Sequence, residues 1–256
     1  MKTARKFRAD RSGQLLIVAA LAIAILIAST SIYVYELTME QQTVESGSAV
    51  ELALAVKTGL RNAIISALAN ITNGGQRTVL AENLGMLACT YMQLHPQQLC
   101  QIHYTLLNNN GYEDGVKLSW NNNGLGVSSA YTSFTLKILG LTSNITINEA
   151  VNVTTFLTVE GYYTANGNES IKTVRLTCNI FNENKPAKAK KIAVYWEQAP
   201  ELWVPVENPD IADLGNGTYT ITFAVTTASE SVNVSVQIVD ARNIFVMANA
   251  TCNQAG

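Results

Sequence analysis

A long uncharged stretch near the N-terminus constrains this chain more than any other feature. The 21 residues from Leu15 to Tyr35 carry no charge, and their main polar interruption is the cluster from Ser29 to Ser31. At a rise of 1.5 Å per residue, a helix of this length covers about 30 Å, which is the hydrocarbon thickness of a bilayer. The stretch therefore predicts a membrane-spanning helix over residues 15–35.

The flanking charges predict the orientation of this helix. Five basic residues and only one acid, Asp10, precede it, whereas four glutamates follow it before the first lysine, Lys57. An excess of lysine and arginine stays on the cytoplasmic side of a membrane. We therefore expect residues 1–13 to form a cytoplasmic basic leader, and residues beyond about 36 to lie outside the cell.

Three interpretations of the stretch differ in how it is processed. A cleaved secretory signal has an apolar core of roughly 7–15 residues and a small-residue cut site. This core is longer, and Ala28-Ser29-Thr30 is a poor cut site. An uncleaved signal anchor would remain as a single-pass span. The third interpretation rests on the boundary Arg11-Ser12-Gly13-Gln14, where the basic residues stop and the apolar run begins.

That boundary resembles the class III signal of type IV pilin-like proteins, especially archaeal ones, and the resemblance covers residues 1 to about 70. It implies that a prepilin-type peptidase cuts after Gly13, which leaves Gln14 as the mature N-terminus, and that the helix self-associates in a filament. Two positions depart from the family pattern. Ser12 precedes the cut where a basic residue is usual, and Val18 stands where bacterial pilins carry glutamate.

The composition and net charge argue against a nucleic-acid partner. The chain has 256 residues, 14% of them charged, and a net charge of −2. The leader is its one strongly basic segment, so a nucleic-acid partner is not expected. The short lysine cluster from Lys185 to Lys191 is typical of a solvated loop or edge.

Apolar spacing predicts that the N-terminal helix continues to residue 70. Apolar residues recur every four positions along one face, at Leu52, Val56, Leu60, Ile64 and Leu68. Ser46-Gly47-Ser48 is the expected place for a kink or break. Asn and paired glycines at 70–75 predict the stop. A second helix is expected from Arg77 to Leu94, with a further helical turn over Gln98–Leu107, so that residues 71–110 form a helical region.

From residue 111 the pattern changes to strands. Two Asn-Gly turn signals flank Val116–Trp120, and Tyr131–Leu139 alternates with a period of two, so residues 111–146 are predicted to form a β lobe or sheet extension. Residues 147–256 alternate in the same way between turns every 8–12 residues, which is typical of a β-sandwich. The predicted fold class is α+β: a long N-terminal membrane helix, a short helical region and a mainly antiparallel β-sandwich. Its expected strands are 151–161, 173–180, 191–197, 218–223, 232–238 and 244–252.

The predicted sandwich resembles immunoglobulin-like and fibronectin-like modules. The resemblance rests on the inward Cys178, on Trp196 one strand later, and on the turns Asn184-Lys-Pro-Ala187 and Asp213–Tyr219. One feature departs from it, because the second cysteine, Cys252, lies on the final strand, whereas antibody domains carry it on the penultimate one.

The four cysteines, all beyond the span, predict disulfides in an oxidising compartment. Three pairings are possible, and Cys89–Cys100 with Cys178–Cys252 joins cysteines of the same region. An alternative is a zinc site formed by Cys89, His95, Cys100 and His103, although its spacing matches no standard finger.

Seven Asn-X-Ser/Thr sequons agree with an extracytoplasmic location. In the predicted strands, Asn152, Asn233 and Asn249 face away from the apolar side, whereas Cys178 and Cys252 face toward it. The seven acceptor residues are Asn70, Asn144, Asn152, Asn168, Asn216, Asn233 and Asn249.

The sequence contains no recognisable catalytic set and implies no cofactor. It has no nucleophile elbow, zinc-protease motif or P-loop. Asn208, Asp210, Asp213 and Asn216 are candidates for calcium ligands, but turn capping explains them equally well. Trp120, Trp196 and Trp203 are candidates for a sugar-stacking surface, although tryptophans of sandwiches more often belong to the core.

Two functional hypotheses follow, and neither is enzymatic. In the first, the chain is a pilin-like surface subunit whose helix anchors in the membrane and assembles a filament. In the second, it is a single-pass surface protein whose sandwich binds or adheres to a protein or glycan without polymerising. A third possibility, an anchored hydrolase, has no sequence support.

Overall fold

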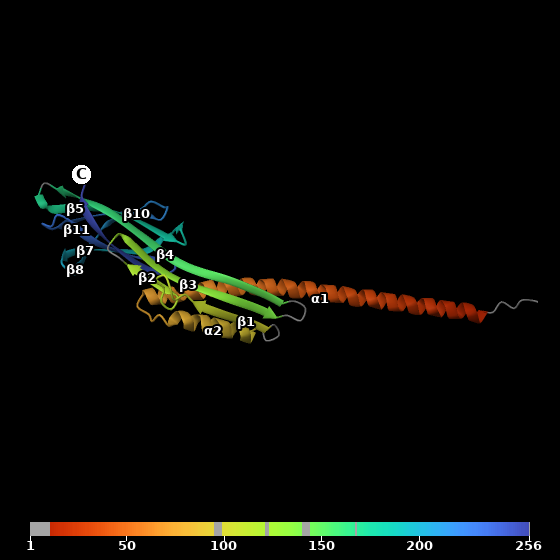
Figure 1. Cartoon of the computed structure of the whole chain (residues 1–256). Coiled ribbons are helices and arrows are strands. Elements are labelled where there is room, and N and C mark those ends of the chain that lie inside the picture. Colours follow the sequence, from red (N-terminus) through yellow and green to blue (C-terminus); the bar gives the residue numbers. More distant parts are fainter. Residues whose placement is uncertain (1–10, 95–98, 121–122, 140–143, 167, 256) are drawn as a thin grey trace, which may run out of the picture.

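Helix α1 dominates the shape of the molecule, because its N-terminal half projects from a head made of the remaining elements (Figure 1). The computed structural model describes residues 11–94, 99–120, 123–139, 144–166 and 168–255; for residues 11–19, 22, 38–49, 99, 166, 168 and 169 it describes the backbone alone. Helix α1 runs from Arg11 to Thr72, 62 residues, and is therefore about 90 Å long.

The expected break at Ser46-Gly47-Ser48 is absent, since α1 is continuous through these residues. Residues 11–72 contain no proline, so every residue can donate its backbone N–H within the helix and no kink is required. The helix stops where predicted. Gly74 adopts a φ of 99° and donates its N–H to the Ile71 carbonyl, and Gly75 donates to the Asn70 carbonyl.

The first core lies between two helices and a sheet. The predicted stripe on α1 is buried, with Val56, Leu60 and Ile64 fully covered. Helix α2, Val79–Leu94, packs beside α1 and adds Leu80 and Leu84. The covering sheet consists of β1 (Leu99–Leu106), β2 (Val116–Trp120), β3 (Leu125–Leu139) and the first half of β4 (Asn144–Asn166).

The helical turn expected over Gln98–Leu107 is wrong, because residues 99–106 form strand β1. Cys100 is buried and Ile102 and Tyr104 are half-buried, whereas Gln101, His103 and Thr105 are exposed. This alternation fits one side of an antiparallel sheet on which helices pack.

The second core lies inside a sandwich-like β domain. Its strands run in the order β8-β7-β11-β12-β4-β5-β10-β9 and pair antiparallel, except for a short parallel contact between β12 and β4 at Asn253–Tyr162 and Gln254–Tyr163. A two-residue strand, β6, pairs with β5. The bounds are β5 Asn168–Asn182, β6 Lys185–Pro186, β7 Ala189–Ala199, β8 Leu202–Pro205, β9 Asp210–Asp213, β10 Thr218–Thr226, β11 Val232–Asp240 and β12 Phe245–Gln254.

Strand β4 belongs to both lobes, so the boundary predicted between residues 146 and 147 falls inside a strand. Residues Val151 and Val153 contribute to the first core, whereas Leu157 and Val159 contribute to the second. Residues 144–158 of β4 pair with β3, and residues 155–166 pair with β5. The sandwich therefore begins near residue 155, and the 111–146 region is continuous with it.

Polar contacts fix α1 against the sandwich. Arg61 of α1 lies 2.9 Å from one oxygen of Glu183, and Arg242 lies 2.7 Å from the other. The Thr72 hydroxyl accepts the Phe245 N–H at 3.1 Å, and Asn73 Nδ2 donates to the Asn243 carbonyl at 3.0 Å. The end of α1 is thus tied to the β5–β6 and β11–β12 turns.

Candidate functional site

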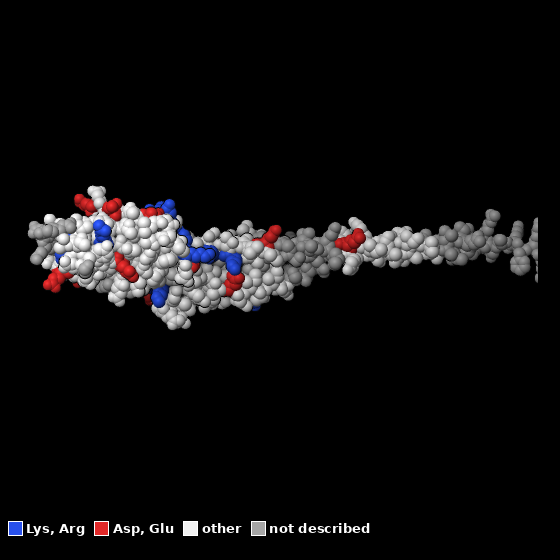
Figure 2. Space-filling model, turned by 90° about the horizontal axis from the view of Figure 1, so that it is seen from above, with Lys and Arg blue, Asp and Glu red and all other residues white. Residues whose placement is uncertain are grey.

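The projecting part of α1 exposes apolar side chains around its circumference. Every described side chain from Ala20 to Leu37 is exposed, and its large apolar ones are 46–65% exposed. Charged side chains gather on the head, while the described residues of the projecting helix from Ala20 to Leu37 include one charged side chain, Glu36 (Figure 2). A continuous apolar surface of this kind marks a site that another apolar phase or protein covers.

Two hydroxyl groups within this segment, those of Ser29 and Thr30, donate hydrogen bonds to carbonyl groups of the helix itself. Ser29 Oγ donates to the Leu26 carbonyl at 3.1 Å, and Thr30 Oγ1 donates to the Leu26 and Ile27 carbonyls at 2.9 and 3.0 Å. Such back-bonding removes the need for water at these side chains. The polar cluster is therefore compatible with apolar surroundings.

Among the described residues, one helical stretch is long and apolar enough to cross a membrane, Val50–Thr72, with a mean hydropathy of 1.3. Of this stretch, 39% is buried in the head, where its apolar side chains contribute to the first core. A shorter apolar helical stretch covers Ile23–Leu37. The N-terminal part of the span predicted at 15–35 falls on residues of which only the backbone is described.

A second exposed apolar surface lies where α1 meets the head. Val50 and Leu54, one helical turn apart, are 54% and 60% exposed. They line an apolar groove of about 210 Å³ between α1 and the β3–β4 hairpin, together with Ala53, Phe134, Leu136, Ile145 and Ile147. Lys57 and Glu149, whose charged groups are 2.8 Å apart, border the same groove.

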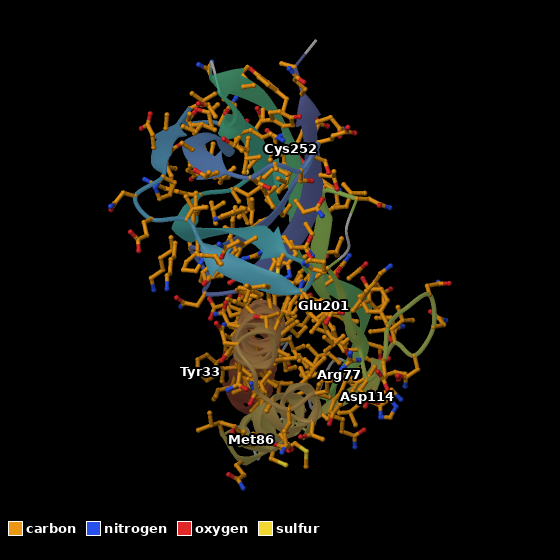
Figure 3. All side chains as sticks on the ribbon, turned by 90° about the vertical axis from the view of Figure 1, so that its left-hand side faces the viewer. Tyr33, Arg77, Met86, Asp114, Glu201 and Cys252 are labelled. Atoms are coloured by element: carbon orange, nitrogen blue, oxygen red, sulfur yellow. The ribbon has the colours of Figure 1, made fainter. Side chains whose placement is uncertain are left out.

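This groove was not predicted from sequence. The four-residue stripe identified the buried face of α1, but Val50 and Leu54 belong to another face that a helical period alone assigns to solvent. The sequence does contain a sign of the groove, because Val50 and Leu54 are apolar although they lie outside the four-residue stripe. Met86, Met92 and Leu94 of α2 are also exposed, and Figure 3 shows Met86 on the outer side of α2.

The predicted processing residues Gly13 and Gln14 lie in the first turns of α1, which begins at Arg11 and not at Gln14. Their side chains, and the leader residues 1–10, fall outside the described part of the chain. Cleavage after Gly13 stays a prediction.

All four cysteines are free thiols in this structure, so neither expected disulfide is formed. Cys89 is exposed on α2 while Cys100 is buried under the helices, and this difference disfavours their pairing. Cys178 and Cys252 are both buried in the sandwich core, on the apolar side as predicted. Burial, with an added effect of the neighbouring Cys252, raises the pKa of Cys178 to about 12; burial also raises the pKa of Cys252 to about 12.

The candidate metal ligands are not brought together. Cys100 and His103 lie on opposite faces of β1, and His95 is outside the described residues. Asp213 and Asn216 accept backbone N–H groups of Gly215 and Thr218, as turn caps. The described residues contain no cluster of three or more His, Cys, Asp or Glu side chains suited to a metal.

The tryptophans do not share one surface. Trp120 and Trp196 pack against the sandwich core, and Trp120 stacks edge-on against Phe245. Trp203 is 37% exposed on β8, on the side opposite to Trp196.

The sequons occupy different settings. Asn70 is exposed in the last turn of α1, Asn144 and Asn152 are exposed on β4, and Asn216 is exposed between β9 and β10. Asn233 and Asn249 face outward on β11 and β12, as predicted, but are half-buried. The side chain of Asn168 is not described.

Comparisons of the whole chain with protein-family models, with curated proteins and with solved structures find no match.

Proposed function

We propose that this chain is a non-enzymatic, pilin-like surface subunit. Its projecting helix anchors in a membrane with the N-terminus in the cytoplasm, and copies of the chain associate through α1 with the head displayed outside. The apolar surface of residues 20–37, with its internally bonded hydroxyls, supports the anchor. The basic leader and the Gly13–Gln14 boundary support the pilin-like processing.

One observation favours assembly over a simple anchor: Val50 and Leu54 are exposed beyond the reach of the membrane. Fifteen helical residues separate Tyr35 from Val50, which is about 22 Å along the axis. Lipid that covers residues 15–35 therefore does not cover Val50 or Leu54 when the helix stands across the bilayer. A neighbouring copy would cover them and the groove beside them.

The alternative is a single-pass surface protein that binds a protein or glycan and does not polymerise. The same apolar helix supports it, because lipid alone would cover residues 20–37. It leaves the exposed side chains of Val50 and Leu54 without an explanation.

The mature N-terminus tests the proposal. The full chain is purified from the membranes of cells that naturally make it, and its N-terminal peptide is identified by mass spectrometry. We expect Gln14 at the N-terminus, because the prepilin-type cut removes the basic leader. An intact leader through residue 13 would exclude this processing and favour the uncleaved anchor.

A further inference from the structure

Among the sequons whose acceptor side chain the structure describes, two lie beside a reversal of the chain. A third acceptor, Asn168, is the first residue of β5 and pairs with Asn166 of β4, but its side chain is not described. Asn144 is the first residue of β4 and pairs with Leu139, the last residue of the antiparallel strand β3, and both Asn144 and Thr146 are exposed. Asn216 lies in the turn between β9 and β10, flanked by Gly215 and Gly217, whose φ angles are 81° and 79°. Exposed reversals are the places where a bulky group causes the least disturbance to packing.

At Asn216 a hydrogen bond to the side-chain oxygen fixes the conformation of an exposed residue. Its Oδ1 accepts the N–H of Thr218 at 3.2 Å, which fixes the side chain in an Asx turn. The oxygen is thus turned toward the backbone while the residue remains exposed. The Thr218 hydroxyl, two residues on, donates to Asn179 Oδ1 at 2.7 Å and is part-buried.

At Asn233 both atoms of the side-chain amide form hydrogen bonds within the sandwich. Its Nδ2 donates to Glu197 Oε2 at 2.7 Å, and its Oδ1 accepts the Thr251 hydroxyl at 2.8 Å. Thr251 is also the hydroxyl residue of the Asn249 sequon, so one hydrogen-bonded chain links both sequons across β11 and β12. The hydrogen bond from Asn233, followed by one from the Glu201 N–H, lowers the pKa of Glu197.

Two other sequons are also engaged in the fold. Asn152 Oδ1 accepts hydrogen bonds from Ser129 and Thr154 at 3.0 and 2.9 Å. The Asn70 sequon is helical, and its Thr72 is buried and donates to the Leu68 carbonyl at 2.8 Å. In neither case does the acceptor lie at an open reversal of the chain.

We propose that Asn144 and Asn216 are the acceptors of N-linked saccharides, whereas the half-buried Asn233 and Asn249 stay unmodified. This rests on the proposed function, because it places the head outside the cytoplasm. The donor is a saccharide activated as a lipid-linked phosphate, which a cellular transferase delivers. Nδ2 of asparagine forms a bond to the anomeric carbon, the bond from that carbon to the phosphate oxygen breaks, the lipid phosphate leaves, and the Nδ2 proton passes to a base.

A saccharide on Asn144 is compatible with assembly through the groove. Side chains alternate between the faces of β4, so Asn144 and Thr146 point away from the face on which Ile145 and Ile147 line the groove. The saccharide would cover the outward face of the sheet and leave the groove open.

The test uses the full chain purified from cells that naturally make it. Chymotryptic peptides separate Asn216 from Asn233 at Phe223, and Asn233 from Asn249 at Phe245. We expect saccharide masses on the peptides with Asn144 and Asn216, and unmodified masses for Asn233 and Asn249. Thr146→Ala and Thr218→Ala should each remove one saccharide, while the matched variants Thr146→Ser and Thr218→Ser should keep it.

An unmodified Asn144 or Asn216 overturns the assignment at that position, and a saccharide on Asn233 or Asn249 overturns the proposal that these two residues stay unmodified. Protease treatment of intact cells separates this failure from a failure of the proposed function. A head that resists the protease until the cells are lysed contradicts an external location. A digested head with bare sequons contradicts the saccharide assignment alone.

Discussion

Among single residues, Asp240 carries the largest share of the polar contacts at the junction of the two lobes. Its side chain is fully buried. One oxygen accepts the N–H groups of Arg242 and Ile244, and the other accepts from Thr155, Asn182 and the Arg242 guanidinium at 2.9–3.1 Å. A buried carboxylate is tolerated when its acceptor positions are filled in this way.

We expect Asp240→Ala to lower the free energy of unfolding by about 3–5 kcal/mol. The poorly exposed Arg242 loses one of its two carboxylate partners, and several buried or part-buried donors lose their acceptor. Urea denaturation measures the change. The matched control, Asp210→Ala, removes an exposed carboxylate from β9 and should change stability by less than about 0.5 kcal/mol. Similar effects for the two variants would contradict the role of Asp240.

The buried thiols predict a loss of stability at high pH. Burial raises the pKa of Cys178 and of Cys252 from the ordinary thiol value of 9.0 to about 12 in the folded chain. Above pH 9 the unfolded chain releases these protons while the folded chain keeps them. Stability is therefore fully present below pH 9 and falls between about pH 9 and 12, by about 1.4 kcal/mol per thiol for each pH unit.

Urea unfolding at pH 7, 9 and 10.5 measures this effect, with the variant Cys178→Ala/Cys252→Ala as the reference for all other titrating groups. The wild-type chain should lose more stability than the variant between pH 9 and 10.5. Equal losses would show that the two sulfurs do not titrate, as in a disulfide.

At the scale of elements, the packing of α2 on α1 depends on Gly59. A Cβ at this position would lie 3.1 Å from the Tyr91 hydroxyl and 3.4 Å from Leu87 Cδ1. The Tyr91 hydroxyl donates a hydrogen bond to the Ala55 carbonyl at 3.0 Å. A close approach of the two helices is thus possible because residue 59 has no side chain.

Gly59→Val should lower the free energy of unfolding by about 1–3 kcal/mol, because the added methyl groups separate the helices. The control is Gly85→Ala in α2, where the nearest atom is the Tyr104 hydroxyl at 3.5 Å. This change should raise stability by about 0.5–1 kcal/mol through helix propensity. Thermal unfolding compares the two, and a stabilising Gly59→Val would contradict the packing described.

Local patterns predicted most of the elements. The four-residue stripe predicted the buried face of α1, and flanking Asn-Gly turn signals predicted β2. Period-two alternation predicted strands β3, β4, β5, β7, β10, β11 and β12, although several are longer than expected. Strand β1 was predicted as helix because its eight residues also contain apolar residues at helical spacing. The short strands β6, β8 and β9 have too few residues to show a period, and pairing with a neighbour defines them.

At the scale of the whole molecule, the arrangement of the lobes could not be predicted from the sequence. One alternating pattern runs through β4 and does not show that residues 144–154 face helices while residues 157–163 face the second sheet. The groove at Val50 and Leu54 is hidden for the same reason, because it forms only when the β3–β4 hairpin lies beside α1 (Figure 1).

Association of copies through this groove is the central claim, and Leu54→Glu tests it most directly. Chemical cross-linking of the full-length chain in membranes, followed by electrophoresis, is compared for wild type, Leu54→Glu and the control Ser66→Glu at another exposed position of α1. We expect multimers for wild type and Ser66→Glu, and a membrane-bound monomer for Leu54→Glu. A monomeric wild type, or unchanged multimers in Leu54→Glu, would contradict the account.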